Sequence, residues 1–154
     1  MKIMTAAEAV QLINSGESIY IQGSTSIPEV LSQALADRGA ELKDVTIYAA
    51  FAVGRCEAPY CKPEYKDSFN VKSLFVANNI RKWLAAGYGS TIPAFLGEIP
   101  GLFRDGTLPL DAVFLNVSPP NPEGYCSFGV SADLAVSATE CAKKVIVQVN
   151  KAMP

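Results

Sequence analysis

Two polar segments carry groups suited to anion binding or covalent chemistry. The first is Gly23-Ser24-Thr25-Ser26, between an apolar stretch and an amphipathic one. Hydroxyls and backbone amides ahead of a helix favour an anion, such as a carboxylate or a phosphate. The alternative is that these residues only cap the helix, because Ser and Thr are common caps. No Gly-Lys-Ser/Thr follows, so the segment is not a Walker phosphate loop.

The second segment is Gly124-Tyr125-Cys126-Ser127-Phe128-Gly129, which follows the proline-rich run Ser118 to Pro122. Its serine and cysteine raise the question of a nucleophile. The chain has no histidine, so it cannot build a Ser-His-Asp or Cys-His arrangement. Two residues separate Gly124 from Ser127, which also departs from the G-x-S-x-G nucleophile elbow. Ser127 is therefore predicted to hydrogen-bond or to cap.

Composition excludes several classes of function. The net charge is −2 and no basic stripe is present, which argues against nucleic acid as a partner. Hydrophobic residues make up 49% of the chain, so a sizeable core is expected, but no run approaches the length of a membrane span. The first residues lack the apolar stretch of a signal peptide, and a cytoplasmic location is the expectation.

The four cysteines match no zinc or redox spacing. They stand at positions 56, 61, 126 and 141, and no Cys-x-x-Cys pair occurs. Histidine metal sites are excluded, and no metal is expected. The cysteines are predicted to be free thiols, with a reactive Cys126 in the glycine loop as the alternative.

Strands and helices alternate along the chain. Apolar and β-branched stretches predict strands over 18–23, 45–51, 71–77, 111–118 and 143–150. Thr5 and Glu8 form a capping box for a first helix. A second helix is expected to begin at Pro28, with Ser26 as its cap and with Val30, Leu31, Ala34 and Leu35 on its buried face. A third, short helix is predicted after Asn79, which would cap it. A fourth helix is predicted over roughly 131–142.

This alternation predicts an α/β fold, with a mostly parallel sheet flanked by helices. Ligands of such sheets bind beyond the carboxyl ends of the strands. The segments at 23–26 and 118–129 both follow a predicted strand, so both qualify as site loops. The chain stops four residues after the last predicted strand, which suggests a piece of a longer protein.

Three stretches resemble the acetyl-CoA hydrolase/transferase family, of the 4-hydroxybutyrate and butyryl-CoA:acetate CoA-transferase type. They are the start, "KIMTAAEAVQLINSGESIYIQGSTSIPEVLSQALADR", the middle, "IPAFLGEIPGLFRDGTLPLDAVFLNVSPPN", and "SPPNPEGYCSFGVSADLAVSATECAKKVIVQVNKAMP". The likeness extends over essentially the whole chain. Gln22-Gly23 and "GYGSTIP" depart from the usual family pattern, which bears on substrate specificity.

The resemblance implies a class I CoA-transferase-like domain over residues 1–154, the N-terminal one of two. Coenzyme A, as acyl-CoA, and a short-chain carboxylate are the implied substrates. The family's nucleophile is a glutamate of the C-terminal domain, so no catalytic residue is assigned here. Gly23, Ser24 and Thr25 are predicted to bind a substrate carboxylate. The residues predicted to shape the cleft facing the other domain are Pro119, Pro120, Gly124 and Ser127.

Two alternatives stay open at this stage. The same fold serves acyl-CoA hydrolysis if water accepts the acyl group. The chain is alternatively a non-catalytic fragment or subunit that assembles with a partner chain. A homo-oligomer is expected in either case, with no nucleic acid or membrane partner.

Overall fold

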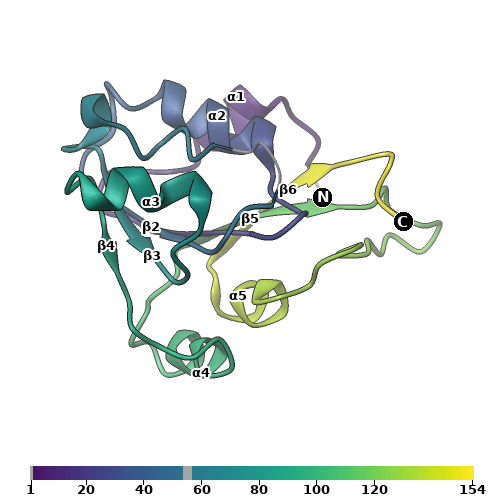
Figure 1. Ribbon diagram of the computed structural model, residues 1–154. Helices are drawn as coiled ribbons and strands as arrows, with labels where there is room; N and C mark the ends of the chain where they lie inside the picture. Colours follow the sequence, from purple (N-terminus) through teal and green to yellow (C-terminus); the bar gives the residue numbers. More distant parts are fainter. Residues whose placement is uncertain (1, 54–56) are drawn as a thin grey trace.

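The computed structural model describes residues 2–53 and 57–154, which form one layered α/β unit (Figure 1). Six strands make a single sheet within the described part of the chain. They are β1 (Ser18–Ile21), β2 (Val45–Ala49), β3 (Phe69–Ser73), β4 (Ser90–Thr91), β5 (Ala112–Val117) and β6 (Lys144–Val149). Every neighbouring pair is parallel, and the order is β4-β3-β2-β1-β5-β6. The predicted parallel α/β fold is confirmed.

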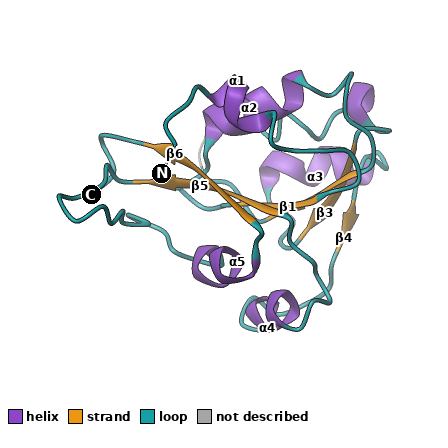
Figure 2. Ribbon diagram, turned by 180° about the vertical axis from the view of Figure 1, so that it is seen from behind, coloured by secondary structure: helices purple, strands orange, loops and turns teal. Residues whose placement is uncertain are grey.

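Helices cover both faces of the sheet (Figures 1 and 2). On one face lie α1 (Ala6–Val10), α2 (Glu29–Asp37) and α3 (Asn78–Ala85); on the other lie α4 (Ile99–Arg104) and α5 (Ala135–Cys141). A short 3-10 helix, Pro63–Tyr65, precedes β3. No helix among the described residues is long and apolar enough to cross a membrane.

Alternation along each strand divides the core in two. Ile19 and Ile21 of β1 point to the α1–α3 face, where they pack with Phe114, whereas Tyr20 points to the α4–α5 face and packs against Phe103. All six residues of β5 are buried, as a parallel strand covered on both faces requires. The continuous apolar run at 112–117 is therefore typical of a strand in the interior of the sheet.

The ends of some helices and strands could be predicted from the local sequence, and others could not. The predicted capping box is confirmed, since the Thr5 hydroxyl accepts from the Glu8 amide and the Glu8 carboxylate accepts from the Thr5 amide. The strand predicted over 71–77 lies two residues earlier and ends at Ser73, because Phe69 pairs with Val45 at the start of β2.

The starts of the two later helices were predicted wrongly. The helix expected from 131 begins at Ala135, since Asp133 has a φ of 34° and accepts a hydrogen bond from the Ser131 hydroxyl. A residue with positive φ interrupts a right-handed helix. Asn79 lies inside α3 instead of capping it, and Ala77 occupies the cap position.

Candidate functional site at the carboxyl edge

The sheet changes direction at β1. From β1 the chain moves outward through β2, β3 and β4, and then returns to the other side of β1 with β5 and β6. In open α/β sheets the crevice at this topological switch point is where ligands bind. The loops that leave β1 and β5 flank it. We name residues 22–28 the β1 loop and residues 118–131 the β5 loop.

Gln22 joins the two loops. Its side chain is fully buried. The side-chain oxygen accepts from the Asn116 amide at 2.8 Å, and the side-chain nitrogen donates to the Ser131 carbonyl at 2.7 Å. One glutamine thus fixes the end of β5 and the end of the β5 loop against β1. Sequence reasoning noted Gln22 only as a departure from the family pattern, although a polar residue closing an apolar strand was the available signal.

Gly23 allows a close backbone approach. A Cβ at this position would lie 2.8 Å from both the Ala50 Cβ and the Phe51 carbonyl oxygen. A Cβ carbon does not approach other non-bonded heavy atoms this closely, so any side chain would push the β1 loop away from the segment after β2. The structure therefore gives Gly23 a packing role, and its predicted contact with a carboxylate is through the backbone alone.

Ser24 has a conformation unusual for a residue with a side chain, with a φ of 59°. Its amide donates to the Phe51 carbonyl at 2.6 Å, and its carbonyl accepts from Val53. A left-handed serine costs roughly 1 kcal/mol, and such residues cluster at functional sites. Since the amide is occupied, only the half-buried hydroxyl of Ser24 and the exposed Thr25 remain to meet a ligand.

Ser26 is not the cap of α2. Its hydroxyl is buried and has no hydrogen-bond partner among the described residues. The α2 amides are instead satisfied from β6, where the Gln148 side-chain oxygen accepts from Val30 at 3.0 Å and from Leu31 at 3.4 Å. Pro28 occupies the cap position rather than the first turn. The cap was missed because the accepting oxygen, on Gln148, lies more than a hundred residues away in the chain.

A second buried hydroxyl lies on β1. Tyr20 is fully buried, and its hydroxyl meets the Gly23 amide only weakly, without hydrogen-bond geometry to any described residue. Burial, together with the negative charge of Asp133, raises the pKa of Tyr20 above its ordinary value. The phenol therefore stays neutral at physiological pH, and it adds no charge to the crevice.

The β5 loop is held by its own hydrogen bonds. The Ser118 amide donates to the Ser127 carbonyl at 3.0 Å, and the Asn121 amide donates to the Tyr125 carbonyl at 2.8 Å. The Asn121 side-chain oxygen accepts from the Glu123 and Tyr125 amides, which closes the turn around Gly124. Gly124 has a φ of 88°, which explains the glycine. The loop is a narrow hairpin that projects from the sheet (Figure 1).

Ser127 is a structural hydroxyl, as predicted. Its oxygen accepts from the Gly129 amide at 2.9 Å, and its own amide donates to the Ser118 hydroxyl at 2.9 Å. Cys126 beside it is exposed and free. Cys61 and Cys141 are free as well, whereas Cys56 lies outside the described residues.

The two prolines that open the β5 loop are exposed and lie at its base. Pro120 lines a hollow beside β6 on the α1 side. The structure therefore places Gly23, Ser24 and Thr25 in the β1 loop and Gly124 and Ser127 in the β5 hairpin, and Gln22 links the two loops through Ser131. Pro120 does not belong to the same hollow as the β1 loop.

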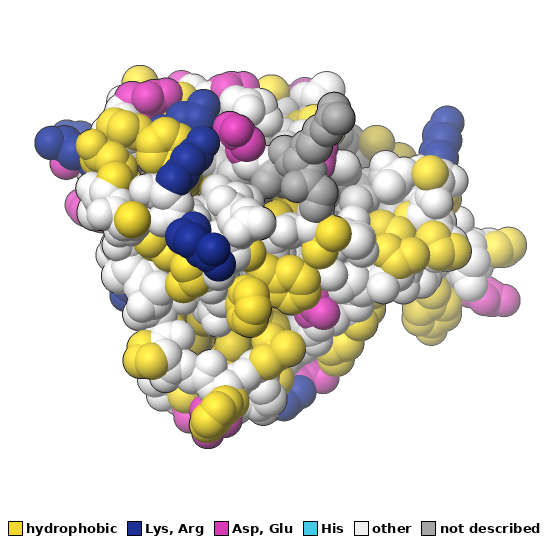
Figure 3. Space-filling model, in the orientation of Figure 1, with side chains coloured by type: hydrophobic (Ala, Val, Ile, Leu, Met, Phe, Trp, Pro, Cys, Tyr) yellow, Lys and Arg dark blue, Asp and Glu magenta, His cyan; other side chains and the backbone are white. Residues whose placement is uncertain are grey.

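The carboxyl edge also carries an apolar rim. Large hydrophobic side chains are exposed in the segments after β2, β3, β4 and β5; they are Val53, Phe75, Val76, Phe95, Leu96, Tyr125 and Val130. Hydrophobic side chains spread over much of the visible face, and few Lys or Arg side chains interrupt them (Figure 3). Exposed apolar side chains at this edge are available for contact with a ligand or with another protein.

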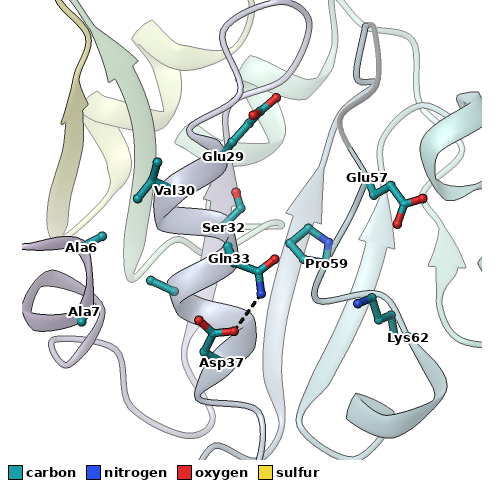
Figure 4. Close-up of a pocket in the computed structure, with 11 residues that line it drawn as sticks. Ala6, Ala7, Glu29, Val30, Ser32, Gln33, Asp37, Glu57, Pro59 and Lys62 are labelled. Carbon is teal, nitrogen blue, oxygen red and sulfur yellow. Dashed lines mark hydrogen bonds between the residues drawn. The ribbon is translucent and has the colours of Figure 1, made fainter.

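Another hollow, between α2 and the segment at 57–62, is a poor candidate for an anionic substrate (Figure 4). Its wall carries the carboxylates of Glu29, Asp37 and Glu57 against the single ammonium of Lys62. Gln33 donates to Asp37 one turn further along α2 at 2.8 Å, so this hydrogen bond stays on one wall of the hollow (Figure 4). No group of acidic, cysteine or histidine side chains in the described residues could hold a metal ion.

The chain forms a parallel α/β domain with two loops at the carboxyl edge of its sheet, and it has no histidine to assist a nucleophile. Comparison with known proteins gives the class a name. The family model "Acetyl-CoA hydrolase/transferase N-terminal domain" matches residues 1–154. The chain belongs to the acetyl-CoA hydrolase/transferase family, as its sequence suggested.

Individual relatives agree with the family. The chain is 35% identical to a 4-hydroxybutyrate coenzyme A transferase of Clostridium kluyveri, over 99% of this chain and 35% of that protein. It is 31% identical to a butyryl-CoA:acetate CoA-transferase of Anaerostipes caccae, over 99% of this chain and 34% of that protein. A crystal structure of a 4-hydroxybutyrate CoA-transferase from Porphyromonas gingivalis superposes with a TM-score of 0.78 at 34% identity, covering 98% of this chain and 34% of that one. The chain thus spans about a third of these relatives.

Proposed function

We propose that this chain forms the N-terminal part of an acyl-CoA:carboxylate CoA-transferase of the 4-hydroxybutyrate or butyrate/acetate type. The observation that carries the proposal is the match of 99% of the chain to relatives with those names. The structure is compatible with it, because the hydroxyls of Ser24 and Thr25 and several exposed apolar side chains follow the carboxyl ends of the strands. Coenzyme A enters as the acyl-CoA substrate, and no metal takes part.

The proposed chemistry needs a carboxylate that this chain does not supply. A glutamate of the C-terminal region attacks the thioester carbonyl, the CoA thiolate leaves, and an acyl-glutamyl anhydride forms. The thiolate then attacks the glutamyl carbonyl and releases the acyl group as a carboxylate, which leaves an enzyme-CoA thioester. The acceptor carboxylate runs these steps in reverse. A weak nucleophile of this kind depends on binding energy from the rest of CoA.

We assign this domain the role of one wall of the substrate site. The Ser24 hydroxyl and the exposed Thr25 would hold the substrate carboxylate. The β5 loop would form the opposite wall, with Pro119, Pro120, Gly124 and Ser127 fixing its shape. The apolar rim would then face the short acyl chain and the second domain, where water exclusion protects the anhydride from hydrolysis.

The carboxylate assignment is tested in the full-length enzyme with Ser24→Ala and Thr25→Ala. Each change removes a hydrogen bond to a charged group, so we expect the KM for the carboxylate acceptor to rise about 10-fold. Thr91→Ala is the matched control, since Thr91 is an exposed threonine on the outer strand β4. Unchanged KM and kcat in both variants would refute the assignment.

Transfer and hydrolysis are separated by supplying butyryl-CoA with and without acetate. A transferase yields acetyl-CoA in proportion to butyrate, whereas a hydrolase of the same family yields free CoA. The relatives with these names are transferases, which favours the first outcome.

The 154-residue chain alone should show no CoA-transferase turnover, and activity should return with a C-terminal chain. Robust activity of the isolated chain would contradict the proposed division of labour. The cytoplasmic location and the homo-oligomeric state remain predictions.

A further inference from the structure

Residues 150–154, which follow β6, turn back toward the β5 loop. The Asn150 amide extends the β5–β6 ladder by donating to the Val117 carbonyl at 2.8 Å. The Asn150 side-chain oxygen accepts from the Ala152 amide at 2.9 Å, and the Asn150 carbonyl accepts from the Met153 amide at 3.1 Å. An asparagine that bonds to the amide two residues further on commonly forms a turn. The C-terminal end accordingly lies beside the β5 loop in both views (Figures 1 and 2).

Met153 differs from its neighbours in burial. Lys151, Ala152 and Pro154 are exposed, whereas Met153 is only 8% exposed. The methionine side chain is unbranched and adapts to an irregular surface. Because the residues on both sides of it are exposed, the burial of Met153 comes from one specific contact and not from general packing of this segment.

The contact is with Gly129, in the returning arm of the β5 loop. Gly129 has a φ of 67°, and a Cβ at this position would collide with the Sδ and Cγ atoms of Met153. The Met153 side chain therefore lies directly on the Gly129 backbone, in space that any other residue type would occupy. Gly124 has a similar φ, but no described atom lies within 4 Å of a Cβ there. Gly129 thus meets two requirements, a left-handed conformation and room for Met153.

Hydrogen bonds connect Gly129 to the hairpin, residues 118–127 of the β5 loop. The Gly129 amide donates to the Ser127 hydroxyl at 2.9 Å, and the Ser127 amide donates to the Ser118 hydroxyl at 2.9 Å. Ser118 directly follows the last residue of β5. The contacts therefore run from the end of the β5–β6 ladder through Met153 and Gly129 to the base of the hairpin.

We propose that Met153 is a positioning residue, which sets the direction in which the hairpin projects over the substrate site. The internal hydrogen bonds of the hairpin keep its shape but leave its angle to the sheet undetermined. Gln22 fixes Ser131, where the loop returns to the sheet, and Met153 contacts Gly129 two residues closer to the hairpin. Met153 thus acts at the point where the angle of the hairpin is set.

The consequence for the reaction rests on the proposed function. If the hairpin is one wall of the site, a shift of the hairpin admits water to the acyl-glutamyl anhydride. Water adds to the anhydride and splits it into the glutamate and the free carboxylate, and the CoA thiolate takes up one of the two protons released. The product is free CoA instead of a new acyl-CoA. Loss of the Met153 contact should therefore raise hydrolysis relative to transfer.

Met153→Ala in the full-length enzyme tests the proposal, with Met153→Leu as the conservative variant. With butyryl-CoA and acetate, the ratio of free CoA to acetyl-CoA should rise about 10-fold in Met153→Ala. It should return to within about two-fold of wild type in Met153→Leu, which keeps most of the side-chain volume. Leu42→Ala is the control, because Leu42 is buried near the amino end of β2, at the opposite edge of the sheet. No rise in Met153→Ala, or an equal rise in Leu42→Ala, would overturn the proposal.

Hydrogen exchange in the same proteins measures positioning without any reference to activity. In Met153→Ala the Ser127 and Gly129 amides, at the base of the hairpin, should exchange about 10-fold faster than in wild type. The Gly124 amide at the tip bonds within the hairpin, and the Ser24 amide lies in the β1 loop, so both should keep their rates. Unchanged exchange at the base, or equal acceleration at all four amides, would contradict a positioning role. A wild type without transfer would refute the proposed function, while exchange would still decide the role of Met153.

A double-mutant cycle with Gly129→Ala assigns the effect to this contact. Gly129→Ala alone adds a methyl group against Met153 and strains a left-handed residue, so free CoA should again increase. Met153→Ala removes the atoms with which that methyl group collides. The double variant should therefore behave like Met153→Ala, with a rise of about 10-fold, because residues in contact are not additive. A rise equal to the product of the two single effects would show independent action and would overturn the proposal.

Discussion

The β1 loop and the β5 loop flank the same crevice but are held in place differently. The β1 loop is fixed from outside, by Gly23 packed against Ala50 and by the Ser24 amide bonded to Phe51. The hairpin of the β5 loop, residues 118–127, is fixed from within through hydrogen bonds between its own two arms, and outside contacts reach the loop only after it, where Gly129 lies against Met153 and Ser131 accepts from Gln22. A packed loop places its few groups accurately but tolerates no added atoms. A self-bonded hairpin keeps its shape while it projects from the sheet, where Tyr125 is 74% exposed.

This difference suits the proposed roles. A group that holds a small carboxylate must be placed accurately, because misplacement by about 1 Å costs much of the rate. A wall that packs against a second domain depends on its overall shape and its apolar surface more than on the exact position of individual groups. The predictions below test whether the two loops respond as differently as their contacts imply.

The largest effect is expected at Gln22, because its side chain bonds to Asn116 of β5 and to Ser131 of the β5 loop while its backbone belongs to the β1 loop. Gln22→Ala leaves the buried Asn116 amide without its acceptor and the Ser131 carbonyl without its donor. Unfolding free energy should fall by about 3 kcal/mol, measured by chemical denaturation. Gln33→Ala, whose side chain is exposed and bonds only to Asp37, should change it by less than about 0.5 kcal/mol. A similar loss in both variants would mean that Gln22 does not join the loops.

Glycine substitutions separate packing from backbone conformation. Gly23→Ala adds a methyl group against Ala50 and Phe51, and it should cost about 2 kcal/mol of stability. Gly124→Ala in the β5 loop has no described atom within 4 Å of the new methyl group. Only the left-handed conformation is then penalised, by about 1 kcal/mol. Thermal or chemical unfolding of both variants measures the difference. If Gly124→Ala cost more, the β1 loop would not be the tightly packed one.

Asn121→Ala should act locally. It removes the oxygen that accepts from the Glu123 and Tyr125 amides, in an exposed loop. Global stability should fall by no more than about 1 kcal/mol, while hydrogen exchange of residues 118–127 accelerates and that of the β1 loop stays constant. Asn70→Ala on the exposed side of β3 is the control. Faster exchange in both loops would show that they are coupled beyond Gln22.

The smallest effect concerns acid, at the opposite end of β5. Hydrogen bonds from Lys143, and from the Ser18 amide, hold the pKa of Asp111 below its ordinary value. This stabilises the folded state at pH values above about 4, and the stabilisation is lost as the pH falls through the lowered value. The contribution should be under about 1 kcal/mol, since the pair lies at the surface. Denaturation at several pH values should show less acid sensitivity in Asp111→Asn than in the wild type.

Lys143→Met is the partner control for this measurement. It removes the first of these hydrogen bonds, so the acid transition should move to higher pH. Exchange in the β5 loop should not follow the transition, since Asp111 acts at the amino end of the strand. If exchange in the β5 loop did accelerate during the acid transition, the two ends of β5 would be coupled, contrary to this expectation.

Sequence reasoning reached the parts of the site that local pattern controls. The prolines and Gly124 predicted a rigid loop, and Ser127 was recognised as a structural hydroxyl. The missed parts all depend on residues distant in the chain. Val30 was expected to be buried because helix periodicity favours it, yet it is 58% exposed and lines the hollow beside β6. Helical periodicity predicts which residues of α2 share one face. It does not predict how much of that face is covered by other parts of the molecule.

By itself, the sequence determined the alternation of strands and helices, the parallel α/β class, the loops at strand ends and the family. These follow from hydrophobic period, turn residues and motifs, all of which act over a few residues. Only the tertiary structure decided the strand order and the link that Gln22 makes between β5 and the β5 loop. It also decided the Gln148 cap of α2 and the hydrogen bond from the Ser24 amide to Phe51. Each of these depends on a contact between segments far apart in the chain, and such contacts exist only once the sheet has formed.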